Sequence, residues 1–277
     1  MAVAVGIGVL YLGSLLGYHW LAGTTQKLGP PDLGTTADTV VVIDLQSVQT
    51  TDNQLTVKVL VLPEDSLINT DLGVVDTDIA VRLYPANDLG DLEYPAGKAP
   101  SQLSATIEAT GDPDSWPFDS YTTPTIQADV IAGSGDTRRF LPARVEVTGT
   151  VEGWDVRSTR SGESSQPSSD RGDDASITLH RAKGPLIFDL GICLVLVSLP
   201  TLAVFVVWQI ARGRKKLSLS FLTWYSGMLF AVVPIRNILP GSPPYGAWID
   251  QALVLWVLVA LAASMAVFIA VWFRQHD

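Results

Sequence analysis

Cysteine and histidine are scarce in this chain. Its 277 residues include one cysteine, Cys193, and three histidines. A single cysteine rules out disulfides and a cysteine-ligated metal centre, so a soluble domain here must be held together by its apolar core. His180 is the one histidine between residues 23 and 185. No Ser-His-Asp or Cys-His catalytic set can be assembled around it.

Charge is also scarce, and it is unevenly distributed. Charged residues make up 17% of the chain, below the ~25% that is usual in soluble domains. Residues 23–185 hold 25 of the 28 acidic residues but 12 of the 18 basic ones, a formal charge of −13. Nucleic acid needs a basic face, so we expect no nucleic-acid partner. The acidic surface is either simply solvated or a docking face.

What the chain has instead is four long apolar runs, at residues 1–22, 186–210, 217–235 and 252–273. About 20 apolar residues cross a bilayer as a helix. We therefore predict four transmembrane helices, with one large soluble domain between the first and the second. A cleaved signal peptide is the alternative for the first run. That run has no basic start and exceeds the ~7–15 apolar residues of such signals, which favours a retained anchor.

The basic residues predict the orientation of these helices. Arg212, Arg214, Lys215 and Lys216 lie between the second and third runs, and Arg274 follows the fourth. Short loops rich in Lys and Arg stay in the cytoplasm. We expect a multi-pass protein of the cell (inner) membrane with both termini cytoplasmic. Residues 23–185 and the connection at 236–250 would then be extracytoplasmic.

Two features of the apolar runs carry possible chemistry. Gly13 and Gly17 form a GxxxG pattern, which lets helix backbones approach closely. It could pack the first helix against the other three or against another protein. Asp189 lies near the start of the second run, either as a proton-relay carboxylate or at the membrane interface. No other acidic residue falls inside a run, which makes a proton-coupled transporter a poor interpretation.

Residues 23–185 show the two-residue periodicity of β-strands. Strands are predicted at 40–45, 54–61, 77–84, 102–109, 125–131, 143–151 and 176–180, separated by turns rich in Gly, Pro, Asp and Asn. Seven or eight short strands without helical patterning predict an antiparallel β-sandwich. The polar, low-complexity segment 157–175 is predicted to be a mobile hairpin loop within that domain.

No metal, cofactor or catalytic residue is predicted. The carboxylate pairs Asp76/Asp78 and Asp112/Asp114 lack the glycine and distant glutamate of a calcium loop, so we interpret them as turn residues. Carboxylate pairs for glycoside hydrolysis depend on a separation in space, and no sequence feature points to one.

Two segments carry unusual chemistry. Residues 114–121 hold three aromatics and a proline, and residues 236–250 form a Pro- and Gly-rich connection with Arg236 and Asp250 at its ends. We expect this Arg and Asp to pair. Both segments either brace the outer domain against the helices or form a partner-docking surface. The interaction candidates of the chain are Gly13, Gly17, Trp116, Phe118, Asp119, Tyr121, Arg236, Asn237, Pro240 and Asp250.

At these two segments the chain resembles a known family. Trp116 to Tyr121 matches a Trp-Pro-Phe-Asp-x-Tyr element, and Arg236 to Gly246 matches Arg-Asn-x-x-Pro-Gly-x-Pro-Pro-x-Gly. Both are similar to motifs of uncharacterised membrane proteins from mycobacteria and other actinobacteria, grouped under a domain of unknown function. That family has one N-terminal helix, a β-rich outer domain and three C-terminal helices. The resemblance implies an accessory role in envelope complexes, including lipid importers built around mammalian-cell-entry proteins.

Three functions therefore remain open. The first is a non-enzymatic accessory subunit, partnered by other membrane proteins of an envelope complex and by membrane lipid. The second is a lipid or small-molecule receptor, which the aromatic cluster Trp116, Phe118 and Tyr121 supports. The third is an envelope hydrolase, which would require acidic residues that converge in space.

Overall fold

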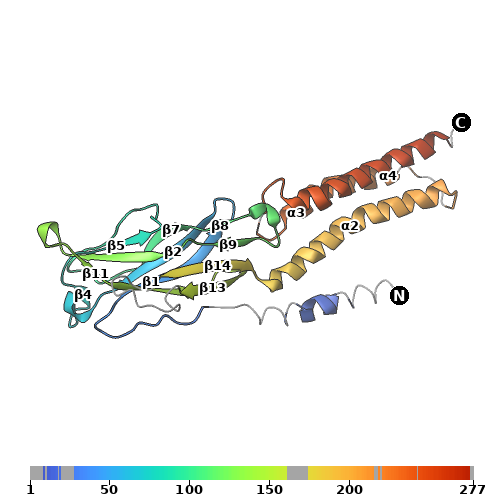
Figure 1. Cartoon of the computed structure of the whole chain (residues 1–277). Helices are drawn as coiled ribbons and strands as arrows, with labels where there is room; N and C mark the ends of the chain where they lie inside the picture. The colour runs from blue at the N-terminus through green and yellow to red at the C-terminus, as the bar shows by residue number, and fades with distance from the viewer. Residues whose placement is uncertain are drawn as a thin grey trace. The chain divides into compact units, whose positions relative to one another are not determined.

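The computed structural model describes residues 9, 11–17, 19, 28–160, 174–214, 218, 220–241 and 243–274. These residues form two compact units (Figure 1). The β unit consists of residues 24–112 and 119–182. The helical unit consists of residues 1–23, 113–118 and 183–277. The short segment 113–118 thus belongs to the helical unit, although it is flanked by strands in the sequence.

The β unit contains three four-stranded sheets and one two-stranded sheet. The first has the order β12-β1-β2-β7, with β1 (Thr39–Gln49), β2 (Gln54–Leu62), β7 (Leu103–Glu108) and β12 (Ala143–Gly149). The second has the order β11-β10-β5-β6, with β5 (Ile79–Tyr84), β6 (Leu92–Tyr94), β10 (Gln127–Ala132) and β11 (Arg139–Leu141). The third has the order β13-β14-β9-β8, with β8 (Thr110–Gly111), β9 (Ser120–Thr122), β13 (Trp154–Arg160) and β14 (Ala175–Arg181). The last pairs β3 (Ile68–Asn69) with β4 (Val74–Val75).

Alternation of apolar and polar residues explains why these segments are strands. In β2 every second side chain, from Leu55 to Val61, is buried, and its neighbours are partly exposed. Successive strand residues point to opposite faces of a sheet, so such a strand buries one face. Buried residues from all three four-stranded sheets join in a single apolar core. The prediction of a β-rich domain is confirmed.

The antiparallel prediction is wrong for one pair of strands. β1 and β12 are parallel, with Thr39 opposite Ala143 and Leu45 opposite Gly149. A parallel pair needs a long crossover connection, and here the intervening strands supply it. β1 opens with five consecutive buried residues, Thr39–Ile43. Continuous burial on both faces is typical of a strand inside a parallel arrangement, and alternation within single strands did not reveal this pairing.

The predicted loop at 157–175 is too long at both ends. Residues up to Arg160 belong to β13, and Ala175 already belongs to β14. The two strands pair antiparallel from Trp154–Arg181 to Arg160–Ala175. Only Trp154 and Val156 are buried in β13, so its polar second half resembled a loop. The rest of the predicted loop, 161–173, lies outside the described residues.

Within residues 183–274, the described part of the helical unit forms three long helices. They are α2 (Lys183–Ala211), α3 (Ser220–Asn237) and α4 (Leu255–Arg274), and α4 is preceded by a π-helical turn, η5 (Asp250–Val254). Their predicted counterparts were 186–210, 217–235 and 252–273. Side chains from all three helices share one apolar core, which includes Leu196, Tyr225 and Phe268.

Two helices in the described part of the chain, Lys183–Ala211 and Asp250–Arg274, are long and apolar enough to cross a membrane. Few of their side chains are buried in the structure, unlike those of a core helix in a soluble protein. α3 does not meet the same criterion of length and apolarity. Most of the first predicted span lies outside the described residues. Four transmembrane helices are therefore not established.

Candidate functional site

The connection between α3 and α4, which we call the 236–250 turn, is built around an ion pair. Arg236 donates from Nε to Oδ1 of Asp250 and from Nη2 to Oδ2, both at 2.8 Å. The Arg236 side chain is only 7% exposed. A bidentate Arg–carboxylate pair fixes geometry as well as energy. The expected pairing of these two residues is confirmed.

The same arginine also organises the backbone of the turn. Its Nη2 donates to the carbonyl oxygens of Pro243 and Pro244, each at 3.0 Å. The amide of Gly246 donates to Asp250 Oδ2 at 2.9 Å. Arg236 thus satisfies the carbonyl groups of both prolines, and Asp250 satisfies the amide of Gly246. These contacts hold the turn in one conformation.

Trp116 is the second anchor of the 236–250 turn. Its side chain is 1% exposed and packs against Leu239, Ala247 and Ile249. Its indole Nε1–H donates to the carbonyl oxygen of Pro240 at 3.0 Å. A buried tryptophan generally requires such a partner for its N–H. Two segments that lie more than 100 residues apart in the sequence thus meet within the helical unit.

The remaining residues of the 114–121 segment do not join Trp116. Phe118 is 74% exposed, whereas Tyr121 is fully buried in the core of the β unit. The side chains of Trp116, Phe118 and Tyr121 therefore form no common cluster. This removes the aromatic cluster that supported an apolar ligand cleft in the outer domain.

Asp119 forms a second buried ion pair, inside the β unit. It accepts hydrogen bonds from Arg181 Nε to Oδ1 and from Nη2 to Oδ2, the latter at 3.1 Å. The Arg181 guanidinium also lies 4.8 Å from the centre of the Trp154 ring, and Tyr121 packs edge-on against the same ring. This pair ties β14 to the segment that leads into β9. It explains why the sequence singled out Asp119, but it is a structural contact.

The other predicted interaction residues have less defined environments. Asn237 is exposed at the end of α3, and Gly13 has open space where a side chain would lie. At Gly17 an added Cβ would lie 3.1 Å from Ile187 Cδ1 of α2. The first helix thus approaches α2 closely at Gly17, as a small residue permits. Asp189, in the second turn of α2, has a side chain that is 2% exposed.

The outside of the helical unit displays apolar side chains next to the 236–250 turn. Tyr245 is 82% exposed and Ile238 is 61% exposed. Trp248 and Phe118 are exposed as well. Tyr245 is held in place because its ring stacks on Arg236, with 4.7 Å between the guanidinium carbon and the ring centre. The turn is polar and tightly bonded inside, and apolar outside.

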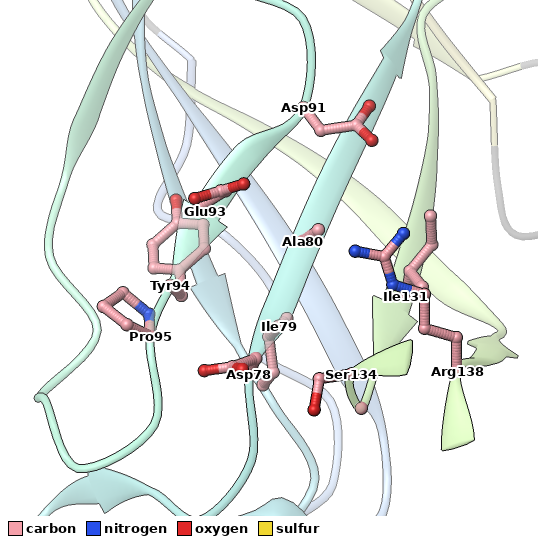
Figure 2. A pocket seen from close by; sticks show the side chains of 11 residues that line it. Asp78, Ile79, Ala80, Asp91, Glu93, Tyr94, Pro95, Ile131, Ser134 and Arg138 are labelled. Carbon is pink, nitrogen blue, oxygen red and sulfur yellow. The ribbon is translucent and has the colours of Figure 1, made fainter. Parts of the chain in front are cut away.

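Two hollows lie elsewhere in the molecule. One is a groove of about 430 Å³ between α2 and α4, lined by Val197, Pro200, Thr201, Val204, Leu253, Trp256, Val257 and Ala260. The other, the sheet pocket of Figure 2, has a volume of about 200 Å³ and is lined by residues of β5, β6, β10 and the β10–β11 connection. Its charged lining residues are Asp78, Asp91, Glu93 and Arg138. They come from three separated segments, so no local sequence pattern marked them.

Among the residues that the structure describes, no three His, Cys, Asp or Glu side chains converge to hold a metal ion.

Comparison with known families places both units in uncharacterised groups. A domain of unknown function (DUF8686) matches residues 181–275. No curated protein matches the chain. A second domain of unknown function (DUF4436) matches residues 30–179, more than half of the chain, and the protein therefore belongs to the DUF4436 family.

Proposed function

We propose that this protein is a non-enzymatic accessory subunit of a larger membrane complex in the cell envelope. In this proposal it is anchored in the cell (inner) membrane with both termini in the cytoplasm and residues 23–185 outside. Its partners are other membrane proteins and the surrounding lipid. The motif resemblance points to an actinobacterial envelope and to a lipid importer of the mammalian-cell-entry type.

The helical unit supports the membrane location. Trp208, near the end of α2, stacks on Arg212, with 3.9 Å between the guanidinium carbon and the ring centre. Trp224 lies in the second turn of α3, and Trp272 and Arg274 lie at the end of α4. Tryptophan and basic residues at one end of apolar helices are typical of a cytoplasmic membrane interface.

Reporter insertions test this topology. We expect alkaline phosphatase, which folds outside the cytoplasm, to be active when inserted after Arg160 and inactive when inserted after Arg214. Green fluorescent protein should give the opposite pattern. Activity of the phosphatase at the second position would contradict the proposed orientation.

The observation that carries the docking proposal is the construction of the 236–250 turn. Two anchors, the Arg236–Asp250 pair and Trp116, fix a short turn whose outer side chains Tyr245 and Ile238 are exposed. Rigid, exposed aromatic residues are the usual centres of binding energy in protein interfaces. A preorganised loop also loses less entropy on binding. The ring of Tyr245 contacts the Arg236 guanidinium and leaves most of its surface exposed.

Site-specific photocrosslinking in native membranes tests the docking proposal. We expect a benzoylphenylalanine at position 245 of the full-length chain to yield one crosslinked product of defined mass. The same group at Leu72, which is 73% exposed in the β3–β4 turn, serves as the control and should yield none. Gentle purification of the tagged protein should recover the same companion in stoichiometric amount.

Surface variants separate docking from folding. Tyr245→Ala with Ile238→Ser removes exposed apolar surface but leaves the Arg236–Asp250 pair in place, so the protein should fold normally. We expect recovery of the companion to fall by tenfold or more, because one interfacial anchor contributes about 2 kcal/mol or more. Leu72→Ala should leave it unchanged. A lone monomer recovered with the wild-type chain would refute an accessory role, and full recovery of the companion with the double variant would refute docking through this turn.

The groove between α2 and α4 favours one alternative, a lipid-binding receptor. The side chains that line the groove are apolar except for Thr201 and the indole N–H of Trp256. The Thr201 hydroxyl donates to the Val197 carbonyl oxygen of its own helix at 2.8 Å. The kink residue Pro200 lies beside it. Such a groove suits an acyl chain. Native mass spectrometry that finds no retained lipid would count against this alternative.

A further inference from the structure

The sheet pocket lies on the face of sheet β11-β10-β5-β6 that points away from the core. Val130, Val81 and Leu92 are opposite one another in the register, and all three are buried in the core. The next row contains Ile131, Ala80 and Glu93. Since adjacent residues of a strand point to opposite faces, this row lies on the outer face. Phe140 of β11 continues it, opposite Ile131.

Small and large side chains along this row create the hollow. Ala80 is the smallest residue in the row and lies at its centre, where it leaves space above the strand. Ile131 and Pro95 complete an apolar floor. Beyond the pocket, the ring of Phe140 is 69% exposed. The result is a hollow with a half-apolar floor and an exposed aromatic ring beside it.

The polar side chains around this floor offer both donors and acceptors. Figure 2 shows the Arg138 guanidinium directed across the pocket toward Ala80, with the Asp91 carboxylate above it and Glu93 beside Tyr94 on β6. Ser134 and Asp78 close the lower end of the view. Among the described residues, the side chains of Arg138, Ser134 and Glu93 have no hydrogen-bond partner. They are free to bind a ligand.

The other two carboxylates are already engaged. Asp91 accepts two hydrogen bonds from Arg82, both at 2.7 Å. This contact holds the pKa of Asp91 below its ordinary value, so the group stays ionised at neutral pH and cannot act as a general acid. Asp78 accepts a hydrogen bond from the amide of Ala96 at 2.9 Å. Among the described residues, Glu93 is therefore the pocket carboxylate that remains available to a ligand.

We propose that the sheet pocket binds one neutral sugar unit of a glycan. Hydroxyl groups both donate and accept hydrogen bonds, which matches a rim that alternates an arginine and a serine with carboxylates. The C–H face of a sugar ring matches the apolar floor and the neighbouring Phe140. Three carboxylates against one arginine exclude phosphate, sulfate and other anions. A volume of about 200 Å³ is below the ~300–1,000 Å³ of drug-sized sites, which fits a single ring.

Saturation-transfer NMR on the full-length protein in detergent tests this proposal. The probes are glucose, galactose, arabinose and N-acetylglucosamine, added singly. We expect at least one to receive saturation and to bind with a dissociation constant on the order of 1 mM, as for a few hydrogen bonds at an open site. This assay is independent of the 236–250 turn, so docking and sugar binding can fail separately.

Matched variants locate the binding site. Glu93 is exposed, so Glu93→Gln should fold normally but weaken binding about tenfold, because a charge-assisted hydrogen bond becomes a neutral one. Ala80→Val fills the floor and should abolish binding. Glu108→Gln, the same change on exposed β7, and Leu72→Ala, an exposed apolar change elsewhere, are the controls and should bind like the wild type.

Three results would overturn the proposal. The first is that none of the four sugars receives saturation. The second is that binding persists in both Glu93→Gln and Ala80→Val, which would place the sugar elsewhere. The third is that spermidine, a polyamine without hydroxyl groups, binds while the sugars do not. That outcome would identify the pocket as a cation site.

Discussion

The buried pair of Asp119 and Arg181 yields a quantitative prediction about the β unit. The Arg181 side chain is 10% exposed and the Asp119 side chain is not exposed at all. Asp119→Ala leaves a guanidinium that can reach water only at its edge. Removal of one partner from a buried ion pair costs about 3–5 kcal/mol. We expect the local stability of β14 to fall by this amount.

Hydrogen–deuterium exchange of the full-length protein measures this loss directly. β14 pairs with both β13 and β9, so its amides should exchange only when the pairing opens. A loss of about 3–5 kcal/mol corresponds to exchange that is roughly a hundredfold to a few thousandfold faster. Peptides from β2, which belongs to another sheet, should accelerate less.

A matched pair on the surface provides the control. Asp91 binds Arg82 with the same two-bond geometry, but the two side chains are 34% and 44% exposed. Solvent screens such a pair, so Asp91→Ala should change exchange very little. Adding Arg181→Met to Asp119→Ala removes the stranded charge and should restore part of the loss. If Asp119→Ala and Asp91→Ala behaved alike, burial would not be what makes the first pair important, and the reasoning would be refuted.

Three further predictions concern other parts of the chain. Arg236→Lys keeps the charge, but a lysine cannot bind Asp250 with two parallel hydrogen bonds and also bind two carbonyl oxygens. Amide hydrogens of the 236–250 turn should therefore exchange at least tenfold faster. Unchanged exchange would show that the ion pair does not fix the turn. In thermal unfolding, Gly149→Ala should destabilise the β unit much more than Gly153→Ala. Both glycines have a positive φ (+100° and +81°), but of the two only Gly149 would place the new Cβ within 3 Å of the β1 backbone. Equal melting points would contradict this reasoning. Burial raises the pKa of Tyr94 above its ordinary value of 10.0. The free energy of unfolding should therefore be unchanged below pH 10 and decrease above it, because the tyrosine ionises first in the unfolded chain. In urea titrations at alkaline pH, Tyr94→Phe should make that decrease smaller.

The strands and long helices could be predicted from the sequence because their signals are local. Alternation in residues 54–61 and an apolar run at 186–210, in which Asp189 is the single charged residue, depend only on neighbouring residues. The parallel pairing of β1 with β12 could not be predicted in this way, since it joins segments more than 100 residues apart. The polar half of β13 was missed because strands with few buried residues resemble loops.

Only the local part of the candidate site could be predicted from the sequence. The Arg236–Asp250 pair spans one short turn, and its two ends were visible in the sequence. The hydrogen bond from Trp116 to Pro240 links distant segments and required the structure. The prediction of an aromatic cluster from Trp116, Phe118 and Tyr121 was misleading. The chain passes from one unit to the other between residues 118 and 119, so Trp116 and Tyr121 belong to different units. The sheet pocket had no sequence signal at all.

The parallel pairing of β1 with β12 also dictates when the β unit can fold. Its first sheet cannot close until residue 149 is available, since residues 39–45 of β1 must find 143–149. Contacts of such long sequence separation form slowly. Until then the edge of β1 that pairs with β12 has unpaired backbone groups next to exposed apolar residues, a state prone to aggregation. In a chain made or exported from its N-terminus, this edge of β1 would stay unpaired until residues 143–149 had emerged.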